Sequence, residues 1–168
     1  NYFLKYIITG ANGCKDTATY GIFVGIAPNS GLSTENPSLQ GCTGASFTFT
    51  FPNSVFSNPP GTLYFVTVDD GSPQIVFTQP PPAQFVHIFN NASCSTTGGN
   101  NYFTVSVSIK NPCNLLGLPI ASIAGIQISQ TPEADFLVSK DSICVNQTVA
   151  LTDISTSTFV TSAGTCSP

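Results

Sequence analysis

The stretch Tyr102-Phe103-Thr104-Val105-Ser106-Val107-Ser108-Ile109-Lys110 decides the fold, because apolar and polar residues alternate along its length. Successive side chains of a β-strand point to opposite faces, so the four apolar residues from Phe103 to Ile109 share one face. The hydroxyl-bearing residues between them fall on the other face. The pattern predicts an antiparallel strand with one face in a core and the other in water.

Similar alternation recurs elsewhere in the chain, and no segment has the period of an α-helix. Clusters such as Asn58-Pro59-Pro60-Gly61 and Pro80-Pro81-Pro82 separate the strands. Short strands between such turns are typical of a sandwich, so we predict an all-β chain. The other strands are expected at Tyr2–Ile8, Thr17–Val24, Ser46–Phe51, Thr62–Val68, Gln74–Thr78, Gln84–Phe89, Ile120–Ile128, Phe136–Ser139 and Thr148–Thr152.

Part of the sequence returns about one hundred residues later. The pair Asn1-Tyr2-Phe3 and Asn12-Gly13-Cys14 returns as Asn101-Tyr102-Phe103 and Asn111-Pro112-Cys113. A period of this length matches one immunoglobulin-like sandwich and not a short solenoid repeat. These segments match the end of such a unit.

A second pair of segments matches the beginning of the unit: Cys42 to Thr50 returns as Cys144 to Thr152. The predicted fold is therefore a series of tandem immunoglobulin-like β-sandwiches. We expect one complete sandwich over residues 26–132, the C-terminal part of another over 1–25, and the N-terminal part of a third over 133–168. Both joints are short and neither is rich in Gly and Ser, so the units should form a stiff string.

The composition excludes several classes of partner. The chain has four Lys, no Arg and eight acidic residues, and its net charge of -4 includes no basic run. This pattern argues against nucleic acid and against anionic membranes. Because no apolar run is long enough to span a bilayer, we predict no membrane insertion.

Six cysteines without a His cluster or a Cys-x-x-Cys motif favour disulfides, and thus an extracellular or otherwise oxidising location.

The cysteines of the complete unit leave two pairings open. Cys42 precedes the second strand of a seven-strand sandwich and Cys94 follows the fifth, so both should lie at the same end. Cys113 follows a strand that covers roughly 30 Å towards the opposite end, whereas a disulfide tolerates a Cα separation of only about 7 Å. We therefore favour Cys42–Cys94, with Cys94–Cys113 as the alternative. Partners outside these residues are expected for Cys14 and Cys166, and Cys144 repeats Cys42.

The candidate catalytic and metal-binding residues are few. Asp69 and Asp70 are adjacent, so their side chains should point to opposite faces of a strand, a poor geometry for paired acid–base work. Asp70-Gly71 is a turn signal, and calcium bound by Asp70 is the alternative interpretation. His87 is the only histidine, and we expect its ring to bond to the backbone or to the turn carboxylate.

No Ser/His/Asp or Cys/His set can be completed from one His and disulfide-bonded cysteines. A phosphate-binding Gly loop is also absent from the sequence. We therefore predict that the chain is not an enzyme and uses no cofactor. Most of its thirteen Phe and five Tyr alternate into strands and should be core. Tyr64 and the Pro80–Pro82 loop are the candidates for exposed contacts with a carbohydrate.

Several segments resemble polycystic-kidney-disease (PKD) domains, in the order that this family has them. Leu63–Pro73 resembles the family signature Trp-Asp-Phe-Gly-Asp-Gly, without its Trp and its first Gly. Gln84–Phe89 resembles the His-x-Tyr strand that follows, with Phe as its last residue. Phe103–Cys113 resembles the penultimate strand, and Pro132–Phe136 resembles the start of the next unit. The signature positions that this resemblance assigns are Asp70, Gly71 and His87.

The cysteine placements resemble tandem PKD-like arrays in very large Bacteroidetes surface proteins, including gliding-motility adhesins exported by type IX secretion. This resemblance implies a location at the cell surface or outside the cell. Asp16-Thr17-Ala18 and Asp141-Ser142-Ile143 resemble the Asp-[Ser/Thr]-apolar motif of Bacteroidetes O-glycosylation. The resemblance to the O-glycosylation motif implies that Thr17 and Ser142 carry sugars.

The expected function is that of a non-catalytic spacer in a large extracellular adhesin or surface filament. Its partners would be neighbouring domains of the same chain, and surface polysaccharide or other cell-surface proteins. A carbohydrate- or protein-binding module attached to a secreted hydrolase is the main alternative. A third interpretation is an assembly protein whose exposed strands pair with other chains.

Overall fold

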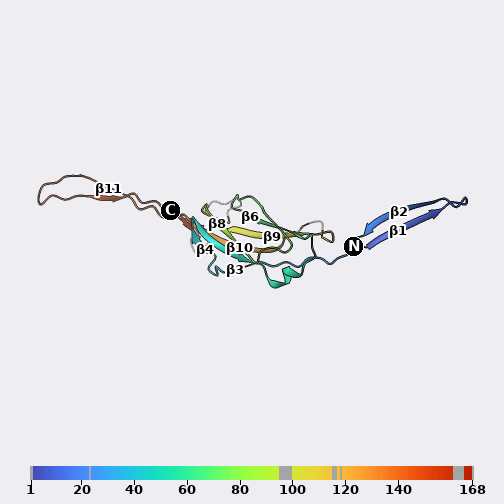
Figure 1. Ribbon diagram of the computed structural model, residues 1–168. Coiled ribbons are helices and arrows are strands. Elements are labelled where there is room, and N and C mark those ends of the chain that lie inside the picture. Colours follow the sequence, from blue (N-terminus) through green and yellow to red (C-terminus); the bar gives the residue numbers. More distant parts are fainter. Residues whose placement is uncertain are drawn as a thin grey trace.

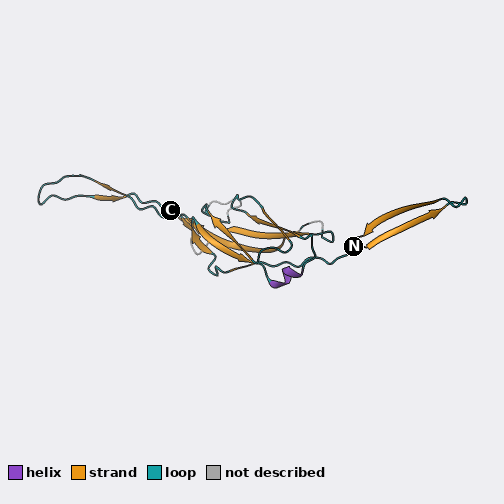
Figure 2. Ribbon diagram, viewed as in Figure 1, coloured by secondary structure: helices purple, strands orange, loops and turns teal. Residues whose placement is uncertain are grey.

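The computed structural model confirms the all-β fold and describes residues 2–22, 24–94, 100–114, 117, 119–160 and 165–167. Its central part, which lies between two hairpins in Figures 1 and 2, is a sandwich of two sheets. The larger sheet has the strand order β4-β10-β9-β6-β7, and the smaller has the order β3-β5-β8. The strands of the larger sheet are β4 (Gln40–Cys42), β6 (Leu63–Val68), β7 (Ile75–Thr78), β9 (Phe103–Lys110) and β10 (Pro119–Ser129). Those of the smaller sheet are β3 (Ser33–Thr34), β5 (Ala45–Thr50) and β8 (Gln84–Phe89), and a 3-10 helix, η1 (Asn53–Ser57), follows β5.

Alternating residues of the two sheets form a single core. In β9 the buried residues are Phe103, Val105, Val107 and Ile109, as the alternation predicts. From the smaller sheet, Phe89 stacks on Phe103 with ring centroids 5.5 Å apart. This contact joins the two sheets directly.

Tyr64 lies in the core and not at the surface, which contradicts the prediction of an exposed carbohydrate contact. Its side chain is fully buried, because it shares the inner face of β6 with Val66 and Val68. The phenol accepts a hydrogen bond from Asn58 Nδ2 at 2.7 Å and lies in hydrogen-bond contact with the Gln79 side chain. Burial raises the pKa of the Tyr64 hydroxyl, although the hydrogen bond from Asn58 opposes this shift.

A hairpin extends from each end of the sandwich (Figure 1). At one end, β1 (Tyr2–Thr9) pairs with β2 (Lys15–Ile22). At the other, β11 (Phe136–Val138) pairs with β12 (Leu151–Asp153). Every residue of these four strands is exposed. The hairpins therefore contribute nothing to the central core.

The chain returns to the sandwich after the second hairpin. A short pair of strands, β13 (Phe159–Val160) and β14 (Cys166–Ser167), lies beside the end of β10. Gln130 N–H donates to the carbonyl of Thr158 at 2.7 Å. Hydrogen bonds thus cross the predicted boundary between residues 132 and 133, and the division into units stays a prediction.

Candidate functional site

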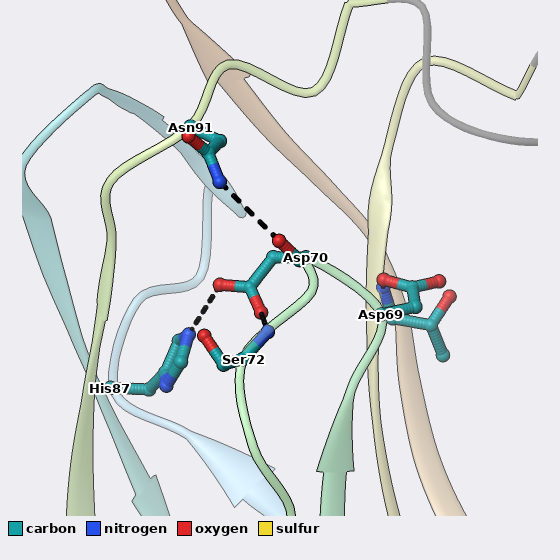
Figure 3. Close-up of polar contacts among 6 residues, drawn as sticks. Asp69, Asp70, Ser72, His87 and Asn91 are labelled. Atoms are coloured by element: carbon teal, nitrogen blue, oxygen red, sulfur yellow. Dashed lines mark hydrogen bonds and ion pairs between the residues drawn. The ribbon is translucent and has the colours of Figure 1, made fainter.

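The predicted turn residues and the single histidine meet at one corner of the sandwich (Figure 3). Gly71 has a φ of 88°, which glycine adopts without strain, and this lets the chain turn between β6 and β7. The Asp70 carboxylate points inward, where its Oδ2 lies 2.7 Å from His87 Nε2 on β8. Its Oδ1 accepts the backbone N–H of Ser72 at 2.9 Å. His87 is thus bonded to the turn carboxylate, one of the two partners predicted for it.

Asp69 points the other way, as adjacency on a strand predicts (Figure 3). Its Oδ1 accepts the backbone N–H of Thr104 at 2.6 Å, and its own N–H donates to the carbonyl of Thr104 at 3.2 Å. Asp69 therefore extends the pairing of β6 with β9, while Asp70 ties the larger sheet to the smaller one. The two carboxylates do not act as a pair.

The Asp70–His87 contact is buried. The side chains are only 3% and 9% exposed, respectively. Burial by itself would raise the pKa of the Asp70 carboxyl, but the hydrogen bonds from His87 and Ser72 outweigh it and lower this pKa below 3.8. Both carboxylate oxygens already have partners, and the described residues include no group of three or more His, Cys, Asp or Glu placed to hold a metal. The contact links the larger sheet, whose β6–β7 turn carries Asp70, to the smaller sheet, whose β8 carries His87, and we call it the Asp70–His87 pin.

This pin predicts a specific pH dependence. Since the pKa of Asp70 is lowered in the folded state, its contribution to stability is complete above the ordinary value of 3.8 and is lost as the pH falls through the folded value. We expect the melting-temperature difference between the wild type and Asp70→Asn to shrink as the pH is lowered from 5 to about 2.5. Thermal unfolding followed by circular dichroism measures this. A difference that stays constant over this range would contradict the assignment.

The structure corrects the predicted disulfide. Cys94 pairs with Cys166, with a Cα–Cα distance of 5.6 Å, and neither Cys42–Cys94 nor Cys94–Cys113 forms. Cys42 does lie at the same end as Cys94, because Thr43 N–H bonds to the carbonyl of Ser129 and Ser93 N–H bonds to that of Ile128. The prediction was wrong because the chain returns to this end 72 residues after Cys94 and brings Cys166 within reach. Exposed free thiols remain at Cys14, Cys42, Cys113 and Cys144.

The sequence reasoning missed a junction between the start and the end of the sandwich. Strand β4 pairs with β10 in parallel, with Gln40 opposite Gln127 and Cys42 opposite Ser129. Beyond these strands the Thr43 and Thr131 hydroxyls lie 2.9 Å apart, and Thr131 N–H donates to Thr43 Oγ1 at 3.1 Å. The parallel pair is short and its β4 segment contains a Gly, so the sequence shows no alternation of apolar and polar residues from which this pairing could be predicted.

The sequence repeat has a counterpart in two turns. Asn12 Oδ1 accepts the N–H of Cys14 at 3.3 Å, and Asn111 Oδ1 accepts the N–H of Cys113 at 2.9 Å. The other turn follows Cys42 and Cys144, where the second residue has positive φ in both places: Gly44 at 88° and Asn146 at 67°. Gly and Asn are among the residues that adopt this conformation most readily. Each pair of turns therefore shares one local feature, although the middle residues Gly13, with a φ of 85°, and Pro112 differ in backbone conformation.

The two predicted acceptors of O-linked sugar, Thr17 on β2 and Ser142 beyond β11, are both exposed. A sugar could therefore reach either hydroxyl without unfolding the chain. Their modification stays a prediction.

Comparison of the chain with protein-family models, with curated proteins and with solved structures found no match. Within the described part of the chain, no helix has the length and apolar character needed to cross a membrane. The function must therefore be argued from the geometry of the sandwich, its junction and its hairpins.

Proposed function

We propose that this chain is a non-catalytic, load-bearing segment of a large extracellular protein built from tandem sandwich units. The observation that carries the proposal is the recurrence of two turn features. An Asn Oδ1 accepts the N–H of the Cys two residues later at 12–14 and at 111–113, and the second residue after a Cys has positive φ at Gly44 and at Asn146. In this interpretation the β1–β2 hairpin corresponds to the last two strands of a unit. The β11–β12 hairpin corresponds to its first strands, so repetition itself is the functional feature.

The order of strands supports an immunoglobulin-like, PKD-like unit. The larger sheet places β10, β9 and β6 side by side with β7 at the edge, and the smaller places β3, β5 and β8 together. This is the division of strands that immunoglobulin-like sandwiches have. We propose that Asp70, Gly71 and His87 fill the PKD signature positions, where the pin between the sheets lies.

The junction of β4 with β10 suits a role under tension. The chain enters the sandwich near Asn111, whose side chain bonds to the carbonyl of Ile26, and leaves from the opposite end after Ser129. When the Cys94–Cys166 bond is reduced, tension between the ends would pull β4 and β10 in opposite directions along their length. Hydrogen bonds between parallel strands pulled this way are loaded together and are not opened one at a time. With the bond intact, the force passes from Cys166 to Cys94 and bypasses β10. The Thr43–Thr131 contacts add to the same junction.

The resemblance to Bacteroidetes surface proteins makes a gliding-motility adhesin exported by type IX secretion the favoured parent. Neighbouring units of the same chain would be the main partners, and surface polysaccharide or other cell-surface proteins would be contacts of the whole adhesin. We propose that Thr17 and Ser142 carry O-linked sugars, which their exposure permits. Intact-mass excess on the corresponding peptides of the protein from its natural host would test this part.

Single-molecule pulling tests the load-bearing role. Under reducing conditions, which open the Cys94–Cys166 bond and place β10 in the load path, the 168-residue chain, held at its two ends, should unfold in one cooperative rupture of the sandwich. Thr43→Val keeps the side-chain shape but removes the hydroxyl from the junction, so it should lower the rupture force. Thr19→Val, on the exposed strand β2, is the matched control and should leave this force unchanged. Gradual extension of the wild type without a rupture event would overturn the proposed function.

A further inference from the structure

The two hairpins expose apolar faces that a soluble monomer would not keep in water. In β1–β2, directly paired residues share a face, so one face gathers Tyr2, Leu4, Tyr6, Ile8, Tyr20 and Ile22. We call it the N-terminal hairpin face, and its residues are between 41% and 72% exposed. A two-stranded hairpin is at best marginally stable in water without a packing partner. Something must therefore cover this face.

The second hairpin has a smaller face of the same kind. Phe136, Val138 and Leu151 share one side of β11–β12 with Asp153, because Val138 lies opposite Leu151 and Phe136 lies opposite Asp153. These three side chains, which form the C-terminal hairpin face, are 59%, 43% and 66% exposed.

The repeat identifies the N-terminal hairpin face with one layer of the sandwich. When the Asn-x-Cys turns at Cys14 and Cys113 are aligned, Leu4, Tyr6 and Ile8 coincide with Phe103, Val105 and Val107 of β9. Alignment at Asn1-Tyr2-Phe3 is shifted by one residue and would match Lys5 with the buried Val105, so the apolar pattern favours the alignment at the turns. Those residues of β9 are 0–3% exposed, since the smaller sheet covers them. The N-terminal hairpin face is thus equivalent to the inner face of the larger sheet.

The C-terminal hairpin face is equivalent to the opposite layer. When the turns at Gly44 and Asn146 are aligned, Leu151 coincides with Phe49 of β5, which is fully buried in the core. In both places the strand pairs with an earlier antiparallel strand, since Phe49 lies opposite Thr34 of β3 and Leu151 lies opposite Val138 of β11, although the two registers differ by two residues. The two hairpin faces are therefore the two halves of one sandwich interface.

We propose that the C-terminal hairpin face of one copy of this chain packs on the N-terminal hairpin face of a second copy, which takes the place that the proposed function gives to a neighbouring unit of the same chain. One copy cannot bring its own faces together, because the hairpins extend from opposite ends of the sandwich (Figure 1). Contacts between two different faces are head-to-tail, so they extend into a linear series of copies unless the rotation closes a ring.

The charges of the hairpins favour this pairing over contacts between like hairpins. Residues 2–22 include two Lys and one Asp, whereas residues 133–153 include one Lys and four acidic residues. Opposite net charges assist the encounter of unlike hairpins and disfavour pairing of the acidic hairpin with itself. Thr17 lies opposite Ile7 and thus on the other side of β1–β2, where a sugar would not obstruct the contact.

Sedimentation velocity of the whole chain over a range of concentrations tests the proposal. The wild type should pass from monomers to dimers and longer species as its concentration rises. Leu151→Ser should weaken association about ten-fold or more by removing apolar area from the interface. Leu137→Ser is the matched control, because Leu137 is 59% exposed and lies on the opposite side of the same hairpin. It should leave association unchanged.

A mixing experiment tests the direction of the contact. Leu4→Ser and Leu151→Ser each disable one face, so each variant alone should be monomeric at concentrations where the wild type assembles. Their mixture retains one intact pair of faces and should form dimers and nothing longer. The proposal would be overturned if the wild type stayed monomeric at every concentration, because other segments or partners would then cover the two faces. It would also be overturned if Leu151→Ser and Leu137→Ser weakened association equally. Because the inference uses the equivalence of the repeats and not the load-bearing role, a failed pulling experiment would leave this test unaffected.

Discussion

Reduction of the Cys94–Cys166 disulfide is expected to lower the free energy of unfolding by about 4 kcal/mol. The bond closes a loop with a sequence separation of 72 residues, and a loop of this length restricts the unfolded chain strongly. It also ties the returning strand β14 to the segment that follows β8. Urea unfolding followed by circular dichroism, with and without a reductant, measures the difference.

The cysteine variants separate this bond from general effects of thiol chemistry. Cys166→Ser should be destabilised about as much as the reduced wild type and should not respond further to reductant. Cys42→Ser removes an exposed free thiol at the same end of the sandwich and should behave as the wild type does. Peptide mapping under non-reducing conditions that joined Cys94 to Cys42 would reject the pairing.

Phe89→Ala is expected to cost about 3–5 kcal/mol of stability. Phe89 is fully buried, and its ring lies 5.3 Å from that of Phe47, 5.5 Å from that of Phe103 and 4.7 Å from that of His87. The side chain thus joins both sheets and supports the pin at Asp70. Its removal would leave a cavity at the centre of the aromatic cluster.

The neighbouring residue is the matched control for this prediction. Ile88 precedes Phe89 on β8 but points outward and is 51% exposed, so Ile88→Ala should change stability by less than about 1 kcal/mol. Chemical denaturation of both variants gives the comparison. Similar losses for the two would mean that β8 does not contribute its alternate residues to a shared core.

Local pattern made the larger strands predictable. The alternation in β9 determines both its existence and its buried face, because the period of two leaves no other set of side chains for the core. The same rule was not applied to β6, where it would have put Tyr64 on the buried face together with Val66 and Val68, as the structure has it. The expectation of an exposed Tyr64 was wrong because the phenol finds its hydrogen bonds inside, from Asn58 and at Gln79.

Contacts between distant residues were harder to predict. The Asp70–His87 contact could be anticipated, since a turn carboxylate is a natural partner for a lone histidine on a nearby strand, here β8. The Cys94–Cys166 bond and the β4–β10 junction could not. Each joins residues that are far apart in the sequence, and no local pattern of residues predicts which distant segments come together.

The length that the chain gains under tension when its disulfide is opened tests most directly the load path that the Cys94–Cys166 bond defines, with β10 outside it while the bond is intact. With the bond intact, force applied between the ends passes from Cys94 to Cys166, and the residues between them stay out of the load path. Pulling under reducing conditions should therefore lengthen the fully unfolded chain by about 240 Å relative to the oxidised chain. Equal unfolded lengths in the two conditions would contradict the account.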